Sequence, residues 1–261
     1  MARAPLVRPT DAPPRAHEPD PATVPVAAPE LPSRSELPRH VAIIMDGNRR
    51  WARQRGVPEL DGHSAGVEAI RGLLRHAVKR GIQVLTLYAF SRENWARTDA
   101  EVVGLFGLLE AAIRSETAEL REQGVRVQLL GRLDELPVET RRSIESALDA
   151  TAAGERLILN IAFNYAGRTE LVDAIRRIVR SGVTADSIDE STVARSLYTG
   201  ELPDPDLVIR TGGEQRLSNF LIWQAAYAEL LTTETLWPDF GADSLDDALA
   251  EYATRTRRFG R

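Results

Sequence analysis

Short apolar, β-branched runs alternate with segments of helical periodicity from His40 to near the end of the chain, and this alternation constrains the fold most strongly. The runs expected to be strands are 41–45, 83–90, 125–130, 157–163, 207–210 and 230–234. The segments expected to be helices are 64–80, 99–122, 138–153, 169–181, 189–199, 218–228 and 243–258. Nearly continuous apolar strands separated by helices are typical of a parallel sheet covered on both faces. The sequence therefore predicts an α/β fold with a central parallel sheet of about six strands flanked by helices.

The first 38 residues differ in composition from the rest of the chain. They contain ten of the fifteen prolines and no cluster of aromatic or β-branched residues. A segment of this kind cannot bury enough apolar surface to offset the entropy lost on ordering. We therefore expect a disordered proline-rich tail over 1–38 and one folded domain over 39–261.

Composition also excludes several functional classes. The formal net charge is −5, whereas general nucleic-acid binders carry a net basic surface, so no nucleic-acid partner is expected. The chain has no cysteine, which excludes disulfides, thiolate catalysis and cysteine-ligated metal sites. No apolar run approaches the ~18 residues that a membrane-spanning helix needs.

Polar residues suited to a charged ligand follow four of the expected strands directly. These segments combine asparagine, glycine and arginine with a few carboxylates, and they are 46–51, 91–97, 164–168 and 210–219. In open α/β sheets, ligands bind outside the carboxyl ends of the strands. Amides and guanidinium groups suit phosphate oxygens, and carboxylates suit a hard divalent cation. The sequence therefore predicts a phosphate-containing ligand and a divalent cation at this edge of the sheet.

The segment Asp46-Gly47-Asn48 is by itself a common turn, but its setting points to more than a turn. A buried strand ends in an acid, which is followed by backbone amides that open a helix and by paired arginines. This arrangement suits a diphosphate held on the helix amides, with Mg²⁺ on the acid.

A second candidate segment runs from Arg210 to Gly213 and continues with Arg216 and Ser218. It is similar to a phosphate cradle, but it matches neither GxxxxGK[ST] nor GxGxxG. These mismatches argue against a P-loop NTPase and against a Rossmann dinucleotide site. A glycine turn with solvated arginines is the alternative interpretation.

Three further residues have both an ordinary and a functional interpretation. Trp95 is part of a stacking platform or of a plain packing pair, and His63 is a helix-start residue or an acid–base group. Glu229 lies in an apolar stretch, where an unpaired carboxylate is costly, so we expect it to have a cation or an arginine as partner.

The expected helix at 99–122 has a broad apolar face, for which core packing is the simplest explanation. Gly104 and Gly107 lie inside this helix, and each costs ~1 kcal/mol relative to alanine. A long apolar ligand lying beside the helix would account for such small residues.

Taken together, the polar segments and their flanking strands resemble one family, the cis-prenyltransferases, of which undecaprenyl diphosphate synthase is the bacterial type. The matching strings, in family order, are 40–52, 86–95, 160–168, 206–214, 216–223 and 257–260. The resemblance implies a catalytic domain over 39–261 that contains a hydrophobic tunnel between helices and forms a homodimer. The chain also lacks the DDxxD motif of trans-prenyltransferases, as that family does.

The reaction implied by the resemblance is the condensation of isopentenyl diphosphate onto an allylic diphosphate, farnesyl or geranyl diphosphate, with formation of a cis double bond and release of diphosphate. Mg²⁺ is the implied cofactor, and the implied product is a polyprenyl diphosphate of long or medium chain. The implied location is the cytoplasm, at the inner face of the membrane with peripheral contact, because the product is a lipid. The alternatives are a short-chain or branching synthase of specialised metabolism and a non-catalytic partner subunit of a synthase.

The resemblance also assigns roles to individual residues. Asp46 is the implied catalytic Mg²⁺ ligand, Asn94 helps to remove the proton, and Glu229 is a second Mg²⁺ ligand. The implied substrate-binding residues are Gly47, Asn48, Arg49, Arg50, Trp51, His63, Ser91, Arg92, Glu93, Trp95, Arg97, Arg210, Arg216, Leu217 and Ser218. The segment 258–260 is similar to a terminal RxG motif that reaches the active site of a neighbouring subunit.

One position departs from the family pattern. Glu59 stands where many members have an arginine four residues before the histidine, and an acid at that place would repel a diphosphate. We therefore expect Glu59 to point away from the site, or Arg53 or Arg55 to compensate its charge. Ala89 matches a small tunnel residue of long-chain members.

Overall fold

The computed structural model of the chain describes residues 37–256, and these contain one six-stranded sheet. The strands are β1 His40–Ile44, β2 Val84–Ser91, β3 Val125–Leu130, β4 Leu157–Tyr165, β5 Leu207–Arg210 and β6 Glu229–Thr232. They lie in the order β3-β4-β2-β1-β5-β6, and every neighbouring pair is parallel. The predicted fold class is therefore confirmed. The tail predicted over 1–38 lies almost entirely outside the described residues.

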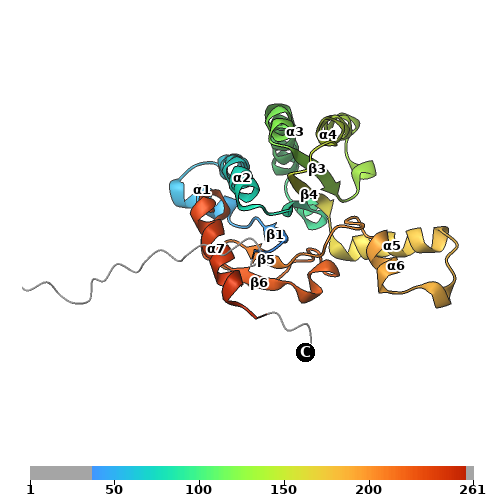
Figure 1. Ribbon diagram of the computed structural model, residues 1–261. Helices are drawn as coiled ribbons and strands as arrows, with labels where there is room; N and C mark the ends of the chain where they lie inside the picture. The colour runs from blue at the N-terminus through green and yellow to red at the C-terminus, as the bar shows by residue number, and fades with distance from the viewer. Residues whose placement is uncertain (1–36, 257–261) are drawn as a thin grey trace, which may run out of the picture. The chain divides into compact units, whose positions relative to one another are not determined.

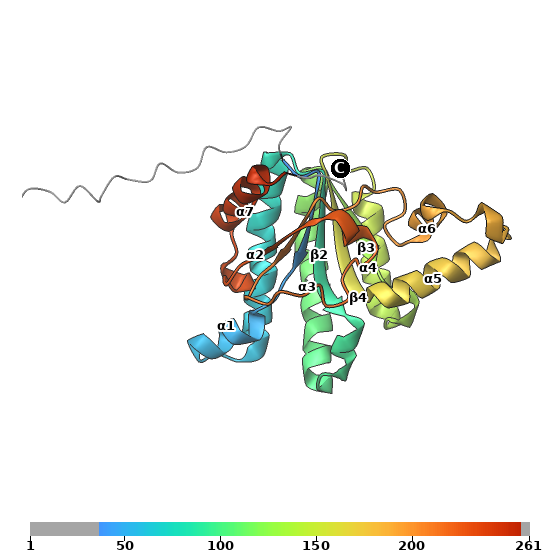
Figure 2. The same cartoon turned by 90° about the horizontal axis from the view of Figure 1, so that it is seen from below.

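Seven α-helices connect or follow the strands in the described part of the chain. They are α1 Asn48–Arg55, α2 Glu59–Arg80, α3 Asp99–Glu122, α4 Val138–Thr151, α5 Gly167–Arg180, α6 Glu190–Ser196 and α7 Ala242–Thr254. Helices α7, α2, α3 and α4 lie over one face of the sheet, whereas α5 and α6 form a hairpin that extends away from it (Figures 1 and 2). Within 37–256, no helix combines the length and the apolar character needed to cross a membrane.

The two faces of β1 show why its sequence is apolar after His40. Val41 and Ile43 pack into a core with α2 and α7, while Ala42 and Ile44 pack into a second core on the opposite face with Phe220. Successive side chains of a strand point to opposite faces, so a strand covered on both sides is apolar on both.

Local signals set the start of α3 and the end of α2 where the sequence predicted them, whereas α2 begins at Glu59 rather than at 64. The Thr98 hydroxyl accepts a hydrogen bond from the Glu101 amide at 3.4 Å, which caps the start of α3. Helix α2 ends at Arg80 and is followed by Gly81, which has a φ of 80° and whose amide bonds the carbonyls of Ala77 and Val78.

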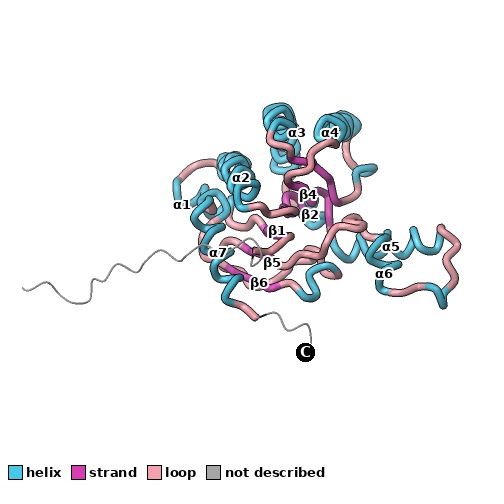
Figure 3. The backbone as a smooth tube through the Cα atoms, in the orientation of Figure 1, coloured by secondary structure: helices cyan, strands magenta, loops and turns pink. Residues whose placement is uncertain are grey.

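The helix predicted at 218–228 is wrong. This stretch is irregular apart from a short 3₁₀ turn, η4 Gln224–Tyr227, and Figure 3 shows the connection between β5 and β6 mainly as loop. Ser218, Asn219 and Leu221 all have positive φ values, which an α-helix excludes. Long-range contacts hold this conformation, because the Asn219 carbonyl and side chain accept hydrogen bonds from the amides that open α5.

The order of the strands decides where a ligand site can form. From β1 the chain moves to one side, to β2, and later returns to β5 on the other side of β1. The connection that follows β1 therefore runs toward β2, whereas the connection that follows β5 runs the opposite way, toward β6. Such a switch point leaves a crevice outside the carboxyl ends of β1 and β5.

Candidate active site

Asp46 is the second residue after β1, at the switch point. One of its carboxylate oxygens accepts a hydrogen bond from Arg210 Nη2 at 2.8 Å, and the other lies 3.3 Å from Arg50 Nη2. The Asp46 side chain is 31% exposed. Two guanidinium groups therefore fix this carboxylate while it stays open to a ligand.

Thr211 and Arg210 hold the backbone and side chain of Asp46 from the neighbouring strand. The buried Thr211 hydroxyl accepts a hydrogen bond from the Asp46 amide at 2.9 Å and donates one to the Asp46 carbonyl at 2.7 Å. Arg210 is also buried, and it donates to the Arg216 carbonyl at 2.6 Å and to the Ser218 hydroxyl at 2.7 Å. The end of β5 thus links Asp46 to the loop that carries Arg216 and Ser218.

Two glycines allow the loops to approach this closely. Gly47 has a φ of 116°, and a Cβ there would lie 2.9 Å from Leu236 Cδ2. Gly212 has a φ of 80°, and a Cβ there would lie 2.3 Å from Arg50 Nη2. A side chain at position 47 would displace the turn that starts α1, and a side chain at position 212 would displace the Arg50 guanidinium beside Asp46.

A polar pocket of about 330 Å³ opens in front of Asp46. Its lining residues are Met45, Asp46, Gly47, Asn48, Arg49, Arg50, Arg53, His63, Arg97, Glu214 and Arg216. Five arginines therefore surround two carboxylates. The excess positive charge, together with the N-terminus of α1, suits an anion with several oxygens.

An apolar cavity of about 180 Å³ adjoins the polar pocket and reaches between α2, α3 and the sheet. Its lining includes Ile70, Leu74, Leu109 and Ile113 from the two helices. The polar pocket and the apolar cavity share three lining residues, which are Met45, Asn48 and His63.

Asn48 and His63 stand at this junction with unsatisfied polar atoms. Asn48 Oδ1 and His63 Nε2 are buried without a hydrogen-bond partner, and His63 Nε2 lies 3.7 Å from Glu101 Oε1. Burial, and then the nearby positive charge of Arg97, lower the pKa of the His63 imidazole, so the ring is neutral near pH 7. A buried polar atom without a partner is costly, so both atoms are suited to meet a ligand.

Glu59 is held by one of the two arginines that were expected to compensate its charge. Its carboxylate accepts hydrogen bonds from Arg53 Nη2 at 2.6 Å and from Arg53 Nε at 3.0 Å. Arg49 Nη1 lies 4.0 Å from the same carboxylate. The hydrogen bonds from Arg53 are the main cause that lowers the pKa of Glu59. Compensation by Arg53 is therefore confirmed, whereas Arg55 bonds Asp239 instead.

The segment after β2 forms the 3₁₀ turn η1 Arg92–Ala96, which begins in a reciprocal cap. The Ser91 amide donates to Asn94 Oδ1 at 3.0 Å, and the Ser91 side chain bonds the Asn94 backbone in return. Glu93 accepts from Asn219 Nδ2 at 2.9 Å, which ties the turn to the loop after β5. Arg97, at the end of the turn, lines the polar pocket.

Several predicted site residues lie outside both the polar pocket and the apolar cavity. Trp51 donates from Nε1 to Asp239 Oδ1 at 2.8 Å and packs under Arg55. Leu217 packs against the second core, on the face of the sheet that holds Phe220.

Glu229 lies at the start of β6, opposite Leu207. Arg210 comes three residues later along β5, so at ~3.3 Å per residue Glu229 is about 10 Å short of the level of Arg210 and Asp46. Arg255 Nη1 lies 3.1 Å from Glu229 Oε2, which confirms the arginine partner expected from the sequence. The fold of one chain does not bring Glu229 to Asp46.

The sequence did not single out Thr211 and Asn164, and it named Arg53 only as a compensating charge. Thr211 and Asn164 are polar, fully buried and placed at the carboxyl ends of β5 and β4. A polar residue directly at the end of an apolar strand is the signal that could have identified them. The predicted motif at 258–260 lies beyond the described residues.

The donor set suits a hard cation that is completed by its ligand. In the part of the chain that the structure describes, no three acidic or histidine side chains converge as a metal cluster. Mg²⁺ is commonly held by one or two carboxylates together with substrate phosphates and water. The partly exposed Asp46 carboxylate beside an anion-binding pocket fits that mode.

Comparison with known proteins connects this site to one family. A family profile described as putative undecaprenyl diphosphate synthase matches residues 44–260. An isoprenyl transferase of Agrobacterium fabrum is 50% identical over 232 residues, which are 87% of this chain and 94% of that protein. An isoprenyl transferase of Heliobacterium mobile is 49% identical over 228 residues, which are 86% of this chain and 88% of that protein.

Solved structures show the same architecture. Lavandulyl diphosphate synthase from Lavandula x intermedia, crystallised with dimethylallyl diphosphate, superimposes with a TM-score of 0.84 at 38% identity, covering 87% of this chain and 100% of that one. A probable undecaprenyl diphosphate synthase from Campylobacter jejuni gives a TM-score of 0.74 at 31% identity, covering 86% of this chain and 99% of that one.

Proposed function

The chain belongs to the undecaprenyl diphosphate synthase family of isoprenyl transferases, and from that premise we propose that it condenses isopentenyl diphosphate onto an allylic diphosphate with formation of a cis double bond. The observation that carries the proposal is the junction between the arginine-rich polar pocket and the apolar cavity at Met45, Asn48 and His63. An allylic diphosphate has the matching form, with an anionic head joined directly to an apolar tail.

The head group is held by the start of α1 and the arginines around it. The amides after Gly47 and the guanidinium groups of Arg49 and Arg50 bind the diphosphate oxygens. Asn48 and the neutral His63 meet it at the junction, where their unsatisfied atoms gain partners. Mg²⁺ would be held by Asp46 and diphosphate oxygens, and when bound it neutralises charge on the departing diphosphate.

The second substrate, isopentenyl diphosphate, binds at the loop after β5. Arg210 already spans Asp46, Ser218 and the Arg216 backbone, so its guanidinium lies between the two diphosphate sites. Arg216 and Ser218 bind the isopentenyl diphosphate group. Held in this way, the two substrates react as neighbours rather than through random encounter.

In the reaction, the allylic C–O bond breaks and the diphosphate leaves with the bonding electrons. The isopentenyl double bond attacks the allylic carbon, and the new C–C bond leaves a cation that loses a proton to the departed diphosphate. Asn94, in the middle of η1, assists this proton loss. The arginines stabilise the charge that develops on the leaving diphosphate, which is commonly the largest catalytic contribution.

The growing chain lies in the apolar cavity, which we propose to be the tunnel implied by the family. The small residues Ala89 and Ala112 line it and leave room for the product. A polyprenyl diphosphate of long or medium chain follows from this proposal. A single short or branched product in the assay below would assign the protein to specialised metabolism instead.

We further propose that the protein is a homodimer that uses the exposed apolar face of α5. Val172, Ile175 and Val179 lie at spacings of three and four residues and are 46%, 57% and 71% exposed. An apolar stripe of this kind on a projecting helix favours burial against a partner. The metal role of Glu229 and the subunit-spanning role of 258–260 stay predictions, as do the cytoplasmic location and contact with the inner face of the membrane.

The test is incubation of the purified protein with Mg²⁺, labelled isopentenyl diphosphate and either geranyl or farnesyl diphosphate, followed by separation of the products by chain length. A ladder of cis-polyprenyl products that requires Mg²⁺ is expected. Absence of incorporation with every primer would refute the proposal and favour a non-catalytic partner subunit. The Asp46→Asn protein serves as the control for activity from contaminants.

A further inference from the structure

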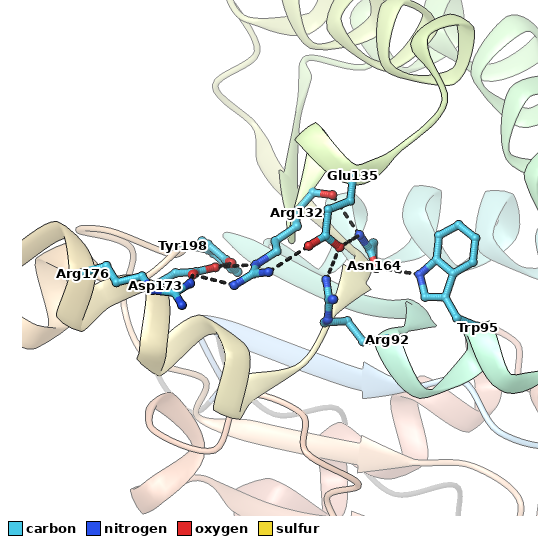
Figure 4. A network of polar contacts seen from close by, with 8 residues as sticks. All are labelled: Arg92, Trp95, Arg132, Glu135, Asn164, Asp173, Arg176 and Tyr198. Carbon is cyan, nitrogen blue, oxygen red and sulfur yellow. Dashed lines mark hydrogen bonds and ion pairs between the residues drawn. The ribbon is translucent and has the colours of Figure 1, made fainter.

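Glu135 lies outside the proposed substrate-binding residues, yet its carboxylate is bonded to the segment that carries Asn94. Glu135 ends the 3₁₀ turn η2 Leu133–Glu135, which follows β3. Its Oε2 accepts hydrogen bonds from Arg92 Nη1 and, at 3.2 Å, from Asn164 Nδ2, while its Oε1 accepts from Arg132 Nη1 at 2.8 Å (Figure 4). Three donors therefore converge on one carboxylate.

Asn164 supplies a second connection to the same segment. Its Oδ1 accepts a hydrogen bond from Trp95 Nε1 at 2.8 Å, and its Nδ2 also donates to the Arg132 carbonyl at 2.9 Å. Asn164 is fully buried and has a φ of 50°, a left-handed conformation that few residues other than glycine adopt. Asparagine is one of the few residues with a side chain that adopt this conformation readily, and its amide here bonds η1 on one side and η2 on the other.

Arg132 fixes Glu135 from the opposite direction. Its guanidinium forms two hydrogen bonds of 2.8 Å with the Asp173 carboxylate on α5, and Tyr198 donates to the same carboxylate at 2.5 Å. Hydrogen bonds from Arg92, followed by those from Arg132 and Asn164, lower the pKa of Glu135 to about 2 despite some desolvation. Glu135 is therefore ionised at every pH at which the enzyme would work.

We propose that Glu135 is a positioning residue that, with Asn164, holds Arg92 and Trp95 and so fixes the segment 91–97 beside the polar pocket. Arg92 lines neither the polar pocket nor the apolar cavity, because its guanidinium turns to Glu135. Its role is then to anchor η1 rather than to bind phosphate. Arg97 and Asn94 lie in the same short segment, so their placement depends on this anchor.

The consequence for catalysis rests on the proposed function, whereas the anchoring itself does not. Glu135 is one-third exposed, so its loss should affect the global stability little. The local effect is larger, because Glu135 holds Arg92 directly and also bonds the Asn164 amide that holds Trp95, so its loss weakens two of the contacts that order 91–97. Removal of Glu135 should therefore loosen 91–97 without unfolding the protein.

The test compares Glu135→Ala with Asp134→Ala, its neighbour in η2, as full-length proteins. Hydrogen exchange of peptides that contain 91–97 is measured by mass spectrometry, together with kcat and KM for the allylic substrate. For Glu135→Ala we expect exchange faster by about three- to tenfold and kcat lower by about tenfold, with KM changed by less than about threefold. Asp134→Ala should match the wild type in all three.

Asn164→Gly gives an independent check, because glycine accepts the φ of 50° while the amide that joins η1 to η2 is removed. It should also speed exchange of 91–97 and lower kcat. Unchanged exchange in Glu135→Ala would overturn the proposal, and so would faster exchange with an unaltered kcat. A wild-type protein without transferase activity would refute the proposed function, while the exchange data would still decide whether Glu135 holds the segment.

Discussion

The carboxylate of Asp46 and the guanidinium of Arg210 are joined by a hydrogen bond of 2.8 Å although the residues are 164 positions apart in the sequence. Strands β1 and β5 are parallel neighbours, and Ile44 lies opposite Arg210, so the residue that ends β5 comes beside the short segment that follows β1. This pairing places the Asp46 carboxylate among several arginines at the switch point of the sheet. Most of the proposed chemistry depends on this placement of Asp46.

Asp46→Asn should lower kcat by on the order of 10³-fold while the protein stays folded. The amide oxygen retains the hydrogen bond with Arg210, but it lacks the charge that binds Mg²⁺ and balances the arginines. Product formation is measured beside the thermal unfolding midpoint, with Asp149→Asn on the exposed face of α4 as control. A folded Asp46→Asn protein with wild-type turnover would contradict the assignment of Asp46.

Glu59→Gln should lower the KM for the allylic diphosphate by about two- to fivefold. The substitution removes a negative charge next to the polar pocket and frees Arg53, which lines it. Arg53→Gln should change KM in the opposite direction, because it leaves Glu59 uncompensated. Glu139→Gln, at an exposed position on α4, is the control for net charge. A change of KM in the same direction for Glu59→Gln and Arg53→Gln would rule out this electrostatic explanation.

Ala112→Leu should shorten the main product relative to the wild type. Ala112 lines the apolar cavity, so the three added carbon atoms occupy space that the growing chain needs. The preceding residue, Ala111, is exposed on the same helix, and Ala111→Leu should leave the product length unchanged. Products from both variants are compared by chromatography, and the same length from both would argue that the chain does not enter this cavity.

His40 should make the protein less stable in mild acid. Burial lowers the pKa of its imidazole from 6.5 to about 4, although the hydrogen bond with the Pro203 carbonyl opposes this shift. Between pH 6.5 and pH 4, the His40 imidazole therefore binds a proton in the unfolded chain but not in the folded chain. The His40 contribution is complete above pH 6.5 and is lost as the pH falls toward 4, at no more than about 1.4 kcal/mol per pH unit.

Urea unfolding between pH 7 and pH 4 measures this dependence on His40. His40→Gln cannot titrate, so its stability should fall less steeply than that of the wild type over the same range. Other groups titrate equally in both proteins. The decisive quantity is therefore the difference between the two slopes of unfolding free energy against pH. Equal slopes would show that His40 does not control acid stability.

Ile175→Glu should convert the proposed dimer into a monomer, because a charge in an apolar interface loses its hydration without a partner. Light scattering coupled to size-exclusion chromatography measures the mass of each form. Val138→Glu changes an exposed apolar residue on α4 and should stay dimeric. If Ile175→Glu keeps the wild-type mass, the contact surface lies elsewhere.

The sequence determined the six strands, most of the helices and the residue types that gather at the carboxyl ends of the strands, but not the bounds of α1 or the irregular stretch at 218–228. The helix at 99–122 and the strand at 125–130 match α3 and β3 because caps, glycine stops and apolar periodicity act within a few residues. The expectation that Glu229 has an ionic partner followed from local polarity alone. Its partner is Arg255, which only the fold could reveal.

Tertiary structure decided which of these residues meet. Strand order joined Asp46 to Arg210 and left Glu229 at the far end of β6, and hydrogen bonds to the start of α5 replaced the helix predicted at 218–228. The contacts of Glu135 with Arg92 and Asn164 were likewise invisible in the sequence. Local preferences are set by neighbours along the chain, whereas these contacts join residues that are distant in the sequence and are brought together only when the strands pair and the cores pack.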